Sequence, residues 1–339
     1  MNIGDIAPHT VLLLLRAAET CGADADLLLA RLGITAAQLR DIDSRISLTE
    51  LMKLGATAIR ETQRPDLGLE MGAICRITDM GLPGMLAMTS PTLGDAIDVL
   101  TRFEPLTGRC YRGTSTYVEQ LPAAVFYSIA PYNEYNRFVV DSLLACWRTL
   151  AETLTGKTGI VAEVHIEFPA PDYAEKYEAF FGAPVTFNRP ESRLVFTPAA
   201  VKLPVLEHHP LIHQQLLMLA QDRMRRLTIG ETFQGKVQQI LGPWLHGQTP
   251  SLEATAERLG IPDWTLRRKL KEEGTTFQAL LDNMRSNLAL GYMRDTQMSF
   301  GEIAYVLGFS TPGAFQRAFK RWTSETPGEY RRRISASHH

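Results

Sequence analysis

Two segments near the C-terminal end of the chain repeat one pattern, 48 residues apart. Residues 251–260 and 299–308 each start with a serine, carry an alanine five positions later and finish in Leu-Gly. A serine caps the first turn of a helix, and a glycine permits the left-handed backbone that ends a helix sharply. The alanine is small enough to lie where two helices cross at a steep angle. The pattern therefore predicts a helix-turn-helix unit that is present twice.

A second helix is expected after each turn. Residues 266–271 and 315–320 correspond at an offset of 49, which places one extra residue in the second turn. In each segment, two apolar residues four positions apart are expected to face the interior, while the arginine between them and the lysine after them face outward. A helical bundle without a partner is the alternative interpretation. Packing alone, however, does not require arginine at matched outward positions.

A third amphipathic segment, residues 277–294, separates the two units. One stripe of apolar side chains runs along it, formed by Phe277, Leu280, Leu281, Met284 and Leu288. A helix of this length spans about 27 Å, and successive major-groove faces of double-stranded DNA lie about 34 Å apart. A rigid connector of this size predicts that one chain can place two recognition helices in adjacent major grooves.

Charge divides along the chain at the same place. The whole chain has 35 Lys and Arg against 37 Asp and Glu, a formal net charge of −2. From residue 230 onward there are 14 basic and 11 acidic residues, a net charge of +3, which leaves −5 for the rest. An acidic first part followed by a basic end is typical of a polyanion-binding module joined to a domain of another kind.

The first part of the chain has helical patterns at the start, and short strands then alternate with helices. We expect helices in residues 9–32, after a Ser47–Glu50 capping box, and in 92–103, 136–154 and 173–181, with strands at 115–120, 123–130, 160–168, 185–187 and 193–196. This order predicts an α+β sensor domain. An all-α domain with two helix-turn-helix motifs joined by a linker helix is expected to follow it.

The expected domain limits are a regulatory α+β domain at 1–205, a linker helix and linker at 206–231, a DNA-binding domain at 232–333 and a tail at 334–339. Within the second of these, residues 210–227 have a helical pattern and 228–230 form a short linker. The helix is expected either to pair with a second copy of the chain or to dock on its own domain.

Residues 232–333 resemble the C-terminal DNA-binding domain of the AraC/XylS family of bacterial regulators. The matching segments are IA at 303–304, LGFS at 307–310, FQRAFKRW at 315–322 and TPGEYR at 326–331. The first part of the chain resembles the α+β effector-binding region of the ornithine-regulator type in this family, rather than the cupin barrel of the arabinose sensor. That likeness rests on its layout and on FFGAPVTF at 180–187.

The resemblance implies roles for matched positions. Trp264, Arg267 and Arg268 correspond to residues that face the major groove, as does Arg317 in the second unit. Pro312 and Gly313 stand where other members often carry polar, base-reading side chains. We therefore expect the first unit to carry most of the direct base readout, and the second to add phosphate contacts and shape readout.

DNA chemistry extends this set. A mid-helix arginine can bond guanine O6 and N7 together, a tryptophan or threonine can contact thymine methyls or sugars, and lysines meet phosphates. A solvated surface charge is the alternative for each basic residue. The full set of expected DNA-binding residues is Trp264, Thr265, Arg267, Arg268, Lys271, Thr311, Gln316, Arg317, Lys320 and Arg321.

The regulatory domain is expected to bind a small-molecule effector of unknown identity. Ligand pockets are mostly apolar with a few placed polar groups, and an arginine would suit a carboxylate. The effector-binding candidates are Tyr111, Arg112, Tyr127, Tyr132, Tyr135, Arg137 and Trp147. Ordinary loop and core aromatics are the alternative for each of them. A regulator controlled by a protein partner instead of a small molecule is the alternative at the level of function.

No catalytic motif is present, so no enzyme activity is expected; a DNA-modifying or repair enzyme with this binding domain is the alternative. His208, His209 and His213 offer a histidine pair for a metal, but a solvated helix start is favoured, and we expect no metal or other cofactor. The four cysteines lie far apart in the sequence, at Cys21, Cys75, Cys110 and Cys146, which favours reduced thiols. Redox or alkylation sensing is the alternative, and only Cys110, beside Arg109 and Arg112, has basic neighbours.

No apolar run is long enough to span a membrane, and the first ten residues lack the basic start of a secretory signal. The sequence therefore predicts a cytoplasmic bacterial transcription regulator, most simply an activator. Its expected partners are double-stranded DNA and the effector, with RNA polymerase and a second copy of the chain as further partners.

Overall fold

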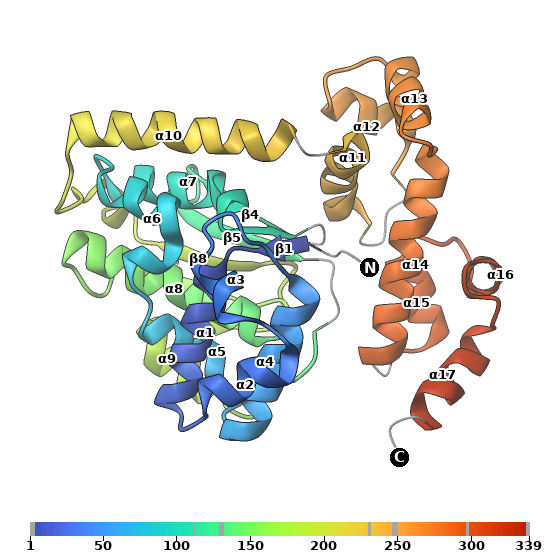
Figure 1. Ribbon diagram of the computed structural model, residues 1–339, viewed down its shortest axis with the longest axis horizontal. Helices are drawn as coiled ribbons and strands as arrows, with labels where there is room; N and C mark the ends of the chain where they lie inside the picture. Colours follow the sequence, from blue (N-terminus) through green and yellow to red (C-terminus); the bar gives the residue numbers. More distant parts are fainter. Residues whose placement is uncertain are drawn as a thin grey trace. The chain divides into compact units, whose positions relative to one another are not determined.

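The computed structural model describes residues 4–110, 113–128, 132–229, 232–245, 250–295 and 298–336. The chain folds into two compact units, one that holds most of the residues up to Ile229 and one that holds the residues after it. The first is an α+β domain and the second is helical, which confirms the predicted fold class. Figure 1 shows the elements of each unit. Within the described ranges, no helix combines the length and the apolar character that a bilayer crossing requires.

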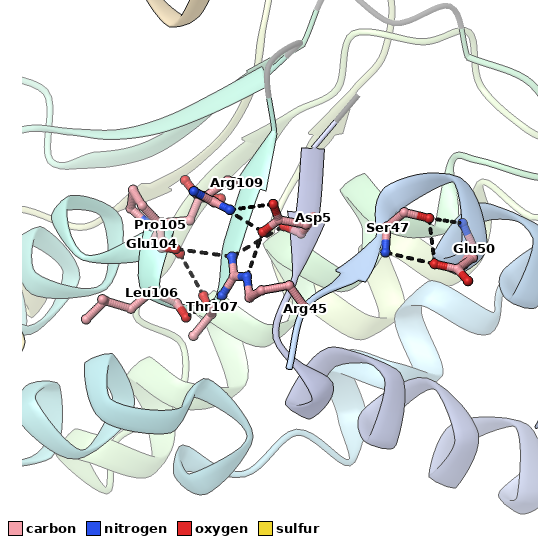
Figure 2. Close-up of polar contacts among 9 residues, drawn as sticks. All are labelled: Asp5, Arg45, Ser47, Glu50, Glu104, Pro105, Leu106, Thr107 and Arg109. Atoms are coloured by element: carbon pink, nitrogen blue, oxygen red, sulfur yellow. Dashed lines mark hydrogen bonds and ion pairs between the residues drawn. The ribbon is translucent and has the colours of Figure 1, made fainter. Parts of the chain in front are cut away.

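The first unit begins with a helical region. Its elements are β1 (Gly4–Ile6), α1 (Pro8–Thr20), α2 (Ala25–Leu32), α3 (Ala36–Arg40), β2 (Ile46–Ser47), α4 (Leu48–Thr62), α5 (Leu67–Ala73), α6 (Gly81–Met88) and α7 (Leu93–Arg102). The predicted capping box is confirmed, since the Ser47 hydroxyl accepts from the Glu50 amide and the Glu50 carboxylate accepts from the Ser47 amide (Figure 2). The predicted helix at 92–103 is α7, and a Thr92 capping box starts it.

A three-stranded sheet, of order β2-β1-β3 with β3 at Gly108–Cys110, is held by a buried charge. Asp5 accepts from Arg45 Nε and from Arg109 Nη2, each at 2.6 Å (Figure 2). Burial alone would raise the pKa of Asp5, but the two guanidinium groups outweigh it and lower the pKa below its ordinary value. The sequence patterns did not predict this sheet, because its strands have two or three residues and its bonds join distant segments.

The second sheet has five strands in the order β4-β5-β8-β6-β7. They are β4 (Gly113–Val118), β5 (Ala123–Ser128), β6 (Val161–His165), β7 (Val185–Thr186) and β8 (Ser192–Phe196). The predicted neighbours 115–120 and 123–130 pair as expected, although residues 129–130 lie outside the described residues. The predicted strand at 160–168 is shorter than expected, since β6 ends at His165 and the chain beyond it bonds to the backbone of 186–189 instead.

Helix α8 (Phe138–Thr155) lies at the centre of the first unit, with α9 (Glu175–Phe181) and α5 against it. The α5 contact is close because Gly68 and Gly72 face α8; a Cβ atom on Gly72 would lie 2.0 Å from the Ala145 Cβ. Fully buried Asp141 of α8 accepts from the Tyr177 hydroxyl at 2.7 Å and from the Tyr173 hydroxyl at 3.3 Å. Burial raises the pKa of Asp141 to about 7.

Helix α10 (Pro210–Ile229) belongs to the first unit and packs on α6 (Figure 1). His208 and His213 bond the carbonyl and the hydroxyl of Thr89, at 2.9 and 3.3 Å. Arg223 forms an ion pair with Asp43 at 3.0 Å. The predicted linker at 228–230 is wrong at its start, because α10 continues through Ile229. Ala220 is buried where the helix docks, while Leu211, Met218 and Leu219 are exposed among polar and charged side chains of the same helix.

The second unit contains seven helices within the described residues (Figure 1). They are α11 (Phe233–Leu241), α12 (Leu252–Arg258), α13 (Asp263–Glu272), α14 (Phe277–Asp295), α15 (Phe300–Val306), α16 (Pro312–Thr323) and α17 (Pro327–Ala336). Short 3₁₀ turns complete the two units at Ile77–Met80, Glu104–Leu106, Ala200–Lys202 and Gly242–Trp244.

The predicted repeat is confirmed in the second unit. Ser251 and Ser299 cap α12 and α15, and both turns pass through a left-handed glycine, Gly260 with φ 64° and Gly308 with φ 72°. The repeat alanines are buried where each first helix meets its recognition helix. The linker segment forms α14, as predicted.

Candidate nucleic-acid interface

Helix α13 divides into two faces, as the sequence predicted. Leu266 and Leu270 are fully buried against the rest of the first helix-turn-helix unit. Trp264, Arg267 and Arg268 are exposed. Lys271 is also exposed, and Thr265 is half-buried. Tryptophan side chains are highly buried on average, so an exposed tryptophan beside two exposed arginines is a candidate contact surface.

Helix α16 presents a second surface of the same kind. Phe315 and Phe319 are fully buried, while Gln316, Arg317, Lys320 and Arg321 are exposed. The Thr311 hydroxyl caps the helix by accepting from the Ala314 amide at 3.2 Å. A Cβ atom on Gly313 would lie 3.6 Å from the Arg317 guanidinium, an ordinary van der Waals contact, so that arginine lies beside the helix start.

Three of the expected DNA-binding arginines are paired with carboxylates. Arg268 lies 2.5 Å from Glu272 on the next turn of α13, and Arg267 lies 3.9 Å from Glu253 on α12. Arg321 donates to Asp282 on α14 at 2.7 Å. The three carboxylates were not predicted as part of the interface. Glu272 follows Arg268 by four positions, so helical spacing alone would have found that pair.

A buried arginine of α14 connects this helix to the second helix-turn-helix unit. Arg285 is 6% exposed, stacks over the Phe309 ring at 5.0 Å and donates to the Gly308 carbonyl at 3.5 Å. Burial lowers the pKa of Arg285 below its ordinary value. This contact, together with the Arg321–Asp282 pair, holds α14 against the turn and the recognition helix, α16, of the second helix-turn-helix unit.

In the first helix-turn-helix unit, a different set of hydrogen bonds anchors the recognition helix, α13. Glu273, at the end of α13, accepts from the backbone amides of Phe233 and Gln234 at the start of α11. Gln234 returns a bond from its side-chain amide to the Glu273 carbonyl at 3.0 Å. The first two free amides of α11 are thereby satisfied by the recognition helix. Glu273 was not predicted, because the residues that it joins are about 40 positions apart.

The structure places the predicted effector-binding residues in different surroundings. Tyr111 and Arg112 lie outside the described residues, and so does the side chain of Tyr127. Tyr132, Tyr135 and Arg137 are half-buried in the segment that leads into α8. The Arg60 guanidinium lies over the Tyr135 ring at 5.4 Å, and that of Arg137 over the Phe168 ring at 5.3 Å. Trp147 is 3% exposed, within the core that α8 forms.

Two family models match the chain. The model of the arabinose-binding domain of the AraC transcription regulator, N-terminal part, matches residues 22–205, and that of a helix-turn-helix domain matches residues 255–333. The chain belongs to the AraC family of transcription regulators. It has a ligand-binding domain followed by a helix-turn-helix DNA-binding domain, as the sequence resemblance implied.

Proteins that align with most of the chain are transcription regulators as well. The ornithine utilization regulator of Pseudomonas aeruginosa is 28% identical over 289 residues, which cover 85% of each chain. The regulator VqsM of the same organism is 25% identical and covers 78% of this chain and 83% of its own. The crystal structure of the P. aeruginosa transcriptional regulator CdpR matches with 21% identity and a TM-score of 0.42, over 91% of this chain and 96% of that one. The two matched domains and the two curated relatives are those of transcription regulators, not of enzymes.

Proposed function

We propose that one chain reads two half-sites in adjacent major grooves of double-stranded DNA, with α13 in one groove and α16 in the next. The observation that carries the proposal is the repeat itself, in which both second helices bury an apolar pair and expose an arginine between its members. Helix α14 has 19 residues, a length of about 28 Å, which suits a separation of one helical turn of DNA.

The two helices are proposed to contribute unequally. In the first, Arg267 and Arg268 read guanine edges, Trp264 and Thr265 contact thymine methyls or sugars, and Lys271 meets a phosphate. In the second, Arg317 is the base reader. Thr311, Gln316 and Lys320 make polar or phosphate contacts, and Arg321 reaches a phosphate only by leaving Asp282. The first half-site is therefore expected to carry more of the sequence information.

Replacing Arg268 by alanine tests this assignment. We expect the affinity for a duplex selected by the wild-type chain to fall by roughly 1–3 kcal/mol, because a bidentate guanine contact is lost, and the preference at that base to relax. Fluorescence anisotropy on the selected duplex and on single-base variants measures both. The control is Lys271→Ala, which should weaken all duplexes about equally. Unchanged affinity and unchanged base preference for Arg268→Ala would refute the assignment.

The effector is proposed to be a small molecule bound by the first unit. The relative named as an ornithine utilization regulator makes free amino acids the first class to test, and a cationic side chain such as Arg137 would suit their carboxylate. Thermal-shift screening of the full chain should reveal an amino acid that raises the melting temperature, since a ligand that binds only the folded state stabilises it by mass action. A screen without any shift, followed by capture of a regulator protein, would favour control by a protein partner.

The chain is further proposed to act as an activator in the cytoplasm, where bacterial DNA and RNA polymerase are found, and as a homodimer. Exposed apolar side chains on α10 support the dimer, because Leu211, Met218 and Leu219 have no apolar partner in the described structure. Light scattering of the wild-type chain should then give twice the chain mass, and Met218→Glu should give the single mass. A monomeric wild-type chain that still binds its duplex would contradict the dimer.

A further inference from the structure

Glu272 lies on the same face of α13 as the expected base-reading residues. Positions 264, 268 and 272 are four apart, so their side chains follow one another along one side of the helix. The Glu272 carboxylate and the Arg268 guanidinium are 2.5 Å apart, with 58% and 55% of the side chains exposed. Any DNA that reaches Arg268 therefore approaches Glu272 as well.

Glu253 places a second carboxylate at the neighbouring arginine. It belongs to α12, and its carboxylate lies 3.9 Å from Arg267, with both side chains well exposed. Two helices thus supply acidic partners to the two adjacent arginines of one recognition helix. Exposed ion pairs of this kind add little to folding stability, so their main physical consequence is the charge that they leave on the DNA-facing surface.

The negative charge of Glu272 and Glu253 affects sequence-independent and sequence-specific DNA binding differently. Sequence-independent binding comes from the attraction of free cations to a dense line of phosphates. A carboxylate beside each arginine cancels much of this attraction, because it is itself repelled by the phosphates within a Debye length of about 8–10 Å. Guanine O6 and N7 are neutral acceptors in a fixed arrangement, so they can still recruit a paired guanidinium by direct hydrogen bonds. The pairs therefore penalise sequence-independent binding more than specific binding.

We infer that Glu272 and Glu253 are specificity-determining residues of the first helix-turn-helix unit. They neutralise Arg268 and Arg267 on DNA that offers only phosphates, and they leave both arginines available to guanine edges. The inference rests on the proposed role of these arginines in base readout. It assigns a function to two carboxylates that make no base contact of their own.

Replacing Glu272 by glutamine tests the inference, because the shape is kept and the charge is removed. Binding of the full chain to a scrambled duplex of about 30 base pairs should tighten about three- to tenfold at physiological salt, and the slope of log affinity against log salt should steepen by about one. Affinity for the selected duplex should change less, so the ratio of specific to scrambled affinity should fall. Glu253→Gln should act in the same direction, and the double variant should show the largest fall.

The matched control is Glu61→Gln. It removes the same charge from an exposed arginine–glutamate pair of the first unit, Arg31–Glu61, and should leave both affinities and the salt slope unchanged. Melting curves of all variants should coincide, since exposed pairs contribute little to stability. An equal effect of Glu61→Gln would show that net charge alone is responsible and would overturn the inference.

Two failures can be told apart. If Arg268→Ala lowers the affinity for the selected duplex but Glu272→Gln changes neither the scrambled affinity nor the salt slope, the inference is wrong and the base-reading role stands. If Arg268→Ala leaves the selected duplex equally well bound, the base-reading role is wrong, and the inference falls with it.

Discussion

Replacing Phe315 by alanine is expected to remove a large part of the stability of the second helix-turn-helix unit. Phe315 has no exposed surface, and its ring lies 5.8 Å from that of Phe309 and 5.7 Å from that of Phe319. Removing a fully buried aromatic ring typically costs about 3–5 kcal/mol, and a whole domain has only about 5–15 kcal/mol of stability. The aromatic cluster that holds α16 in place would lose its central member.

Hydrogen exchange of the full chain measures this effect. Amides of α15, α16 and α17 should lose protection in Phe315→Ala, while those of α8 in the first unit keep it. Gln316→Ala is the control, because that neighbouring side chain is exposed and should change protection little. Full protection of α16 in Phe315→Ala would mean that the cluster does not hold the recognition helix.

Replacing Gly72 by alanine is expected to destabilise the first unit by roughly 3 kcal/mol, the upper part of the range for overpacked cores. The added methyl would lie 2.0 Å from the Ala145 Cβ and within 3 Å of the α8 backbone at that residue, so α5 and α8 must move apart. Separation would open the contact beside Asp141 and the two tyrosines that bind it.

Urea denaturation monitored by the fluorescence of Trp147, which is buried on α8, follows this unit when Trp244, Trp264 and Trp322 of the second unit are replaced by phenylalanine. Adding Ala145→Gly should restore only part of the loss, because the backbone contacts remain. Ala73→Ser is the control, since Ala73 is exposed on the same helix. An unchanged midpoint for Gly72→Ala would show that α5 and α8 do not pack as closely as the structure describes.

The elements that the sequence predicted are those with local signals. Ser47, Ser251 and Ser299 start helices through bonds to residues three positions on, and Gly260 and Gly308 end helices through their own backbone freedom. The family-specific segments near the C-terminal end predicted the second helix-turn-helix unit in the same way. Patterns of this kind depend on a few neighbouring residues, so they are visible before folding.

The missed features depend on contacts between distant residues. Strand β1 is held by Arg45 and Arg109, and helix α5 is short and rich in glycine, which a sequence pattern reads as a loop. In the DNA-binding unit, Glu273 and Asp282 matter through partners about 40 residues away. The exposed residues of the recognition helices could be predicted, but not the carboxylates that pair with them or anchor them.

Methylation protection of guanine N7 on a duplex selected by the chain tests the two-groove reading most directly, because that atom lies in the major groove. Each bound chain should protect two clusters of guanines on one face of the duplex, separated by about 10 base pairs, one helical turn. Arg268→Ala should remove protection in one cluster and Arg317→Ala in the other. A single protected cluster per bound chain, or two clusters that respond to the same substitution, would contradict the proposal that α13 and α16 occupy adjacent major grooves.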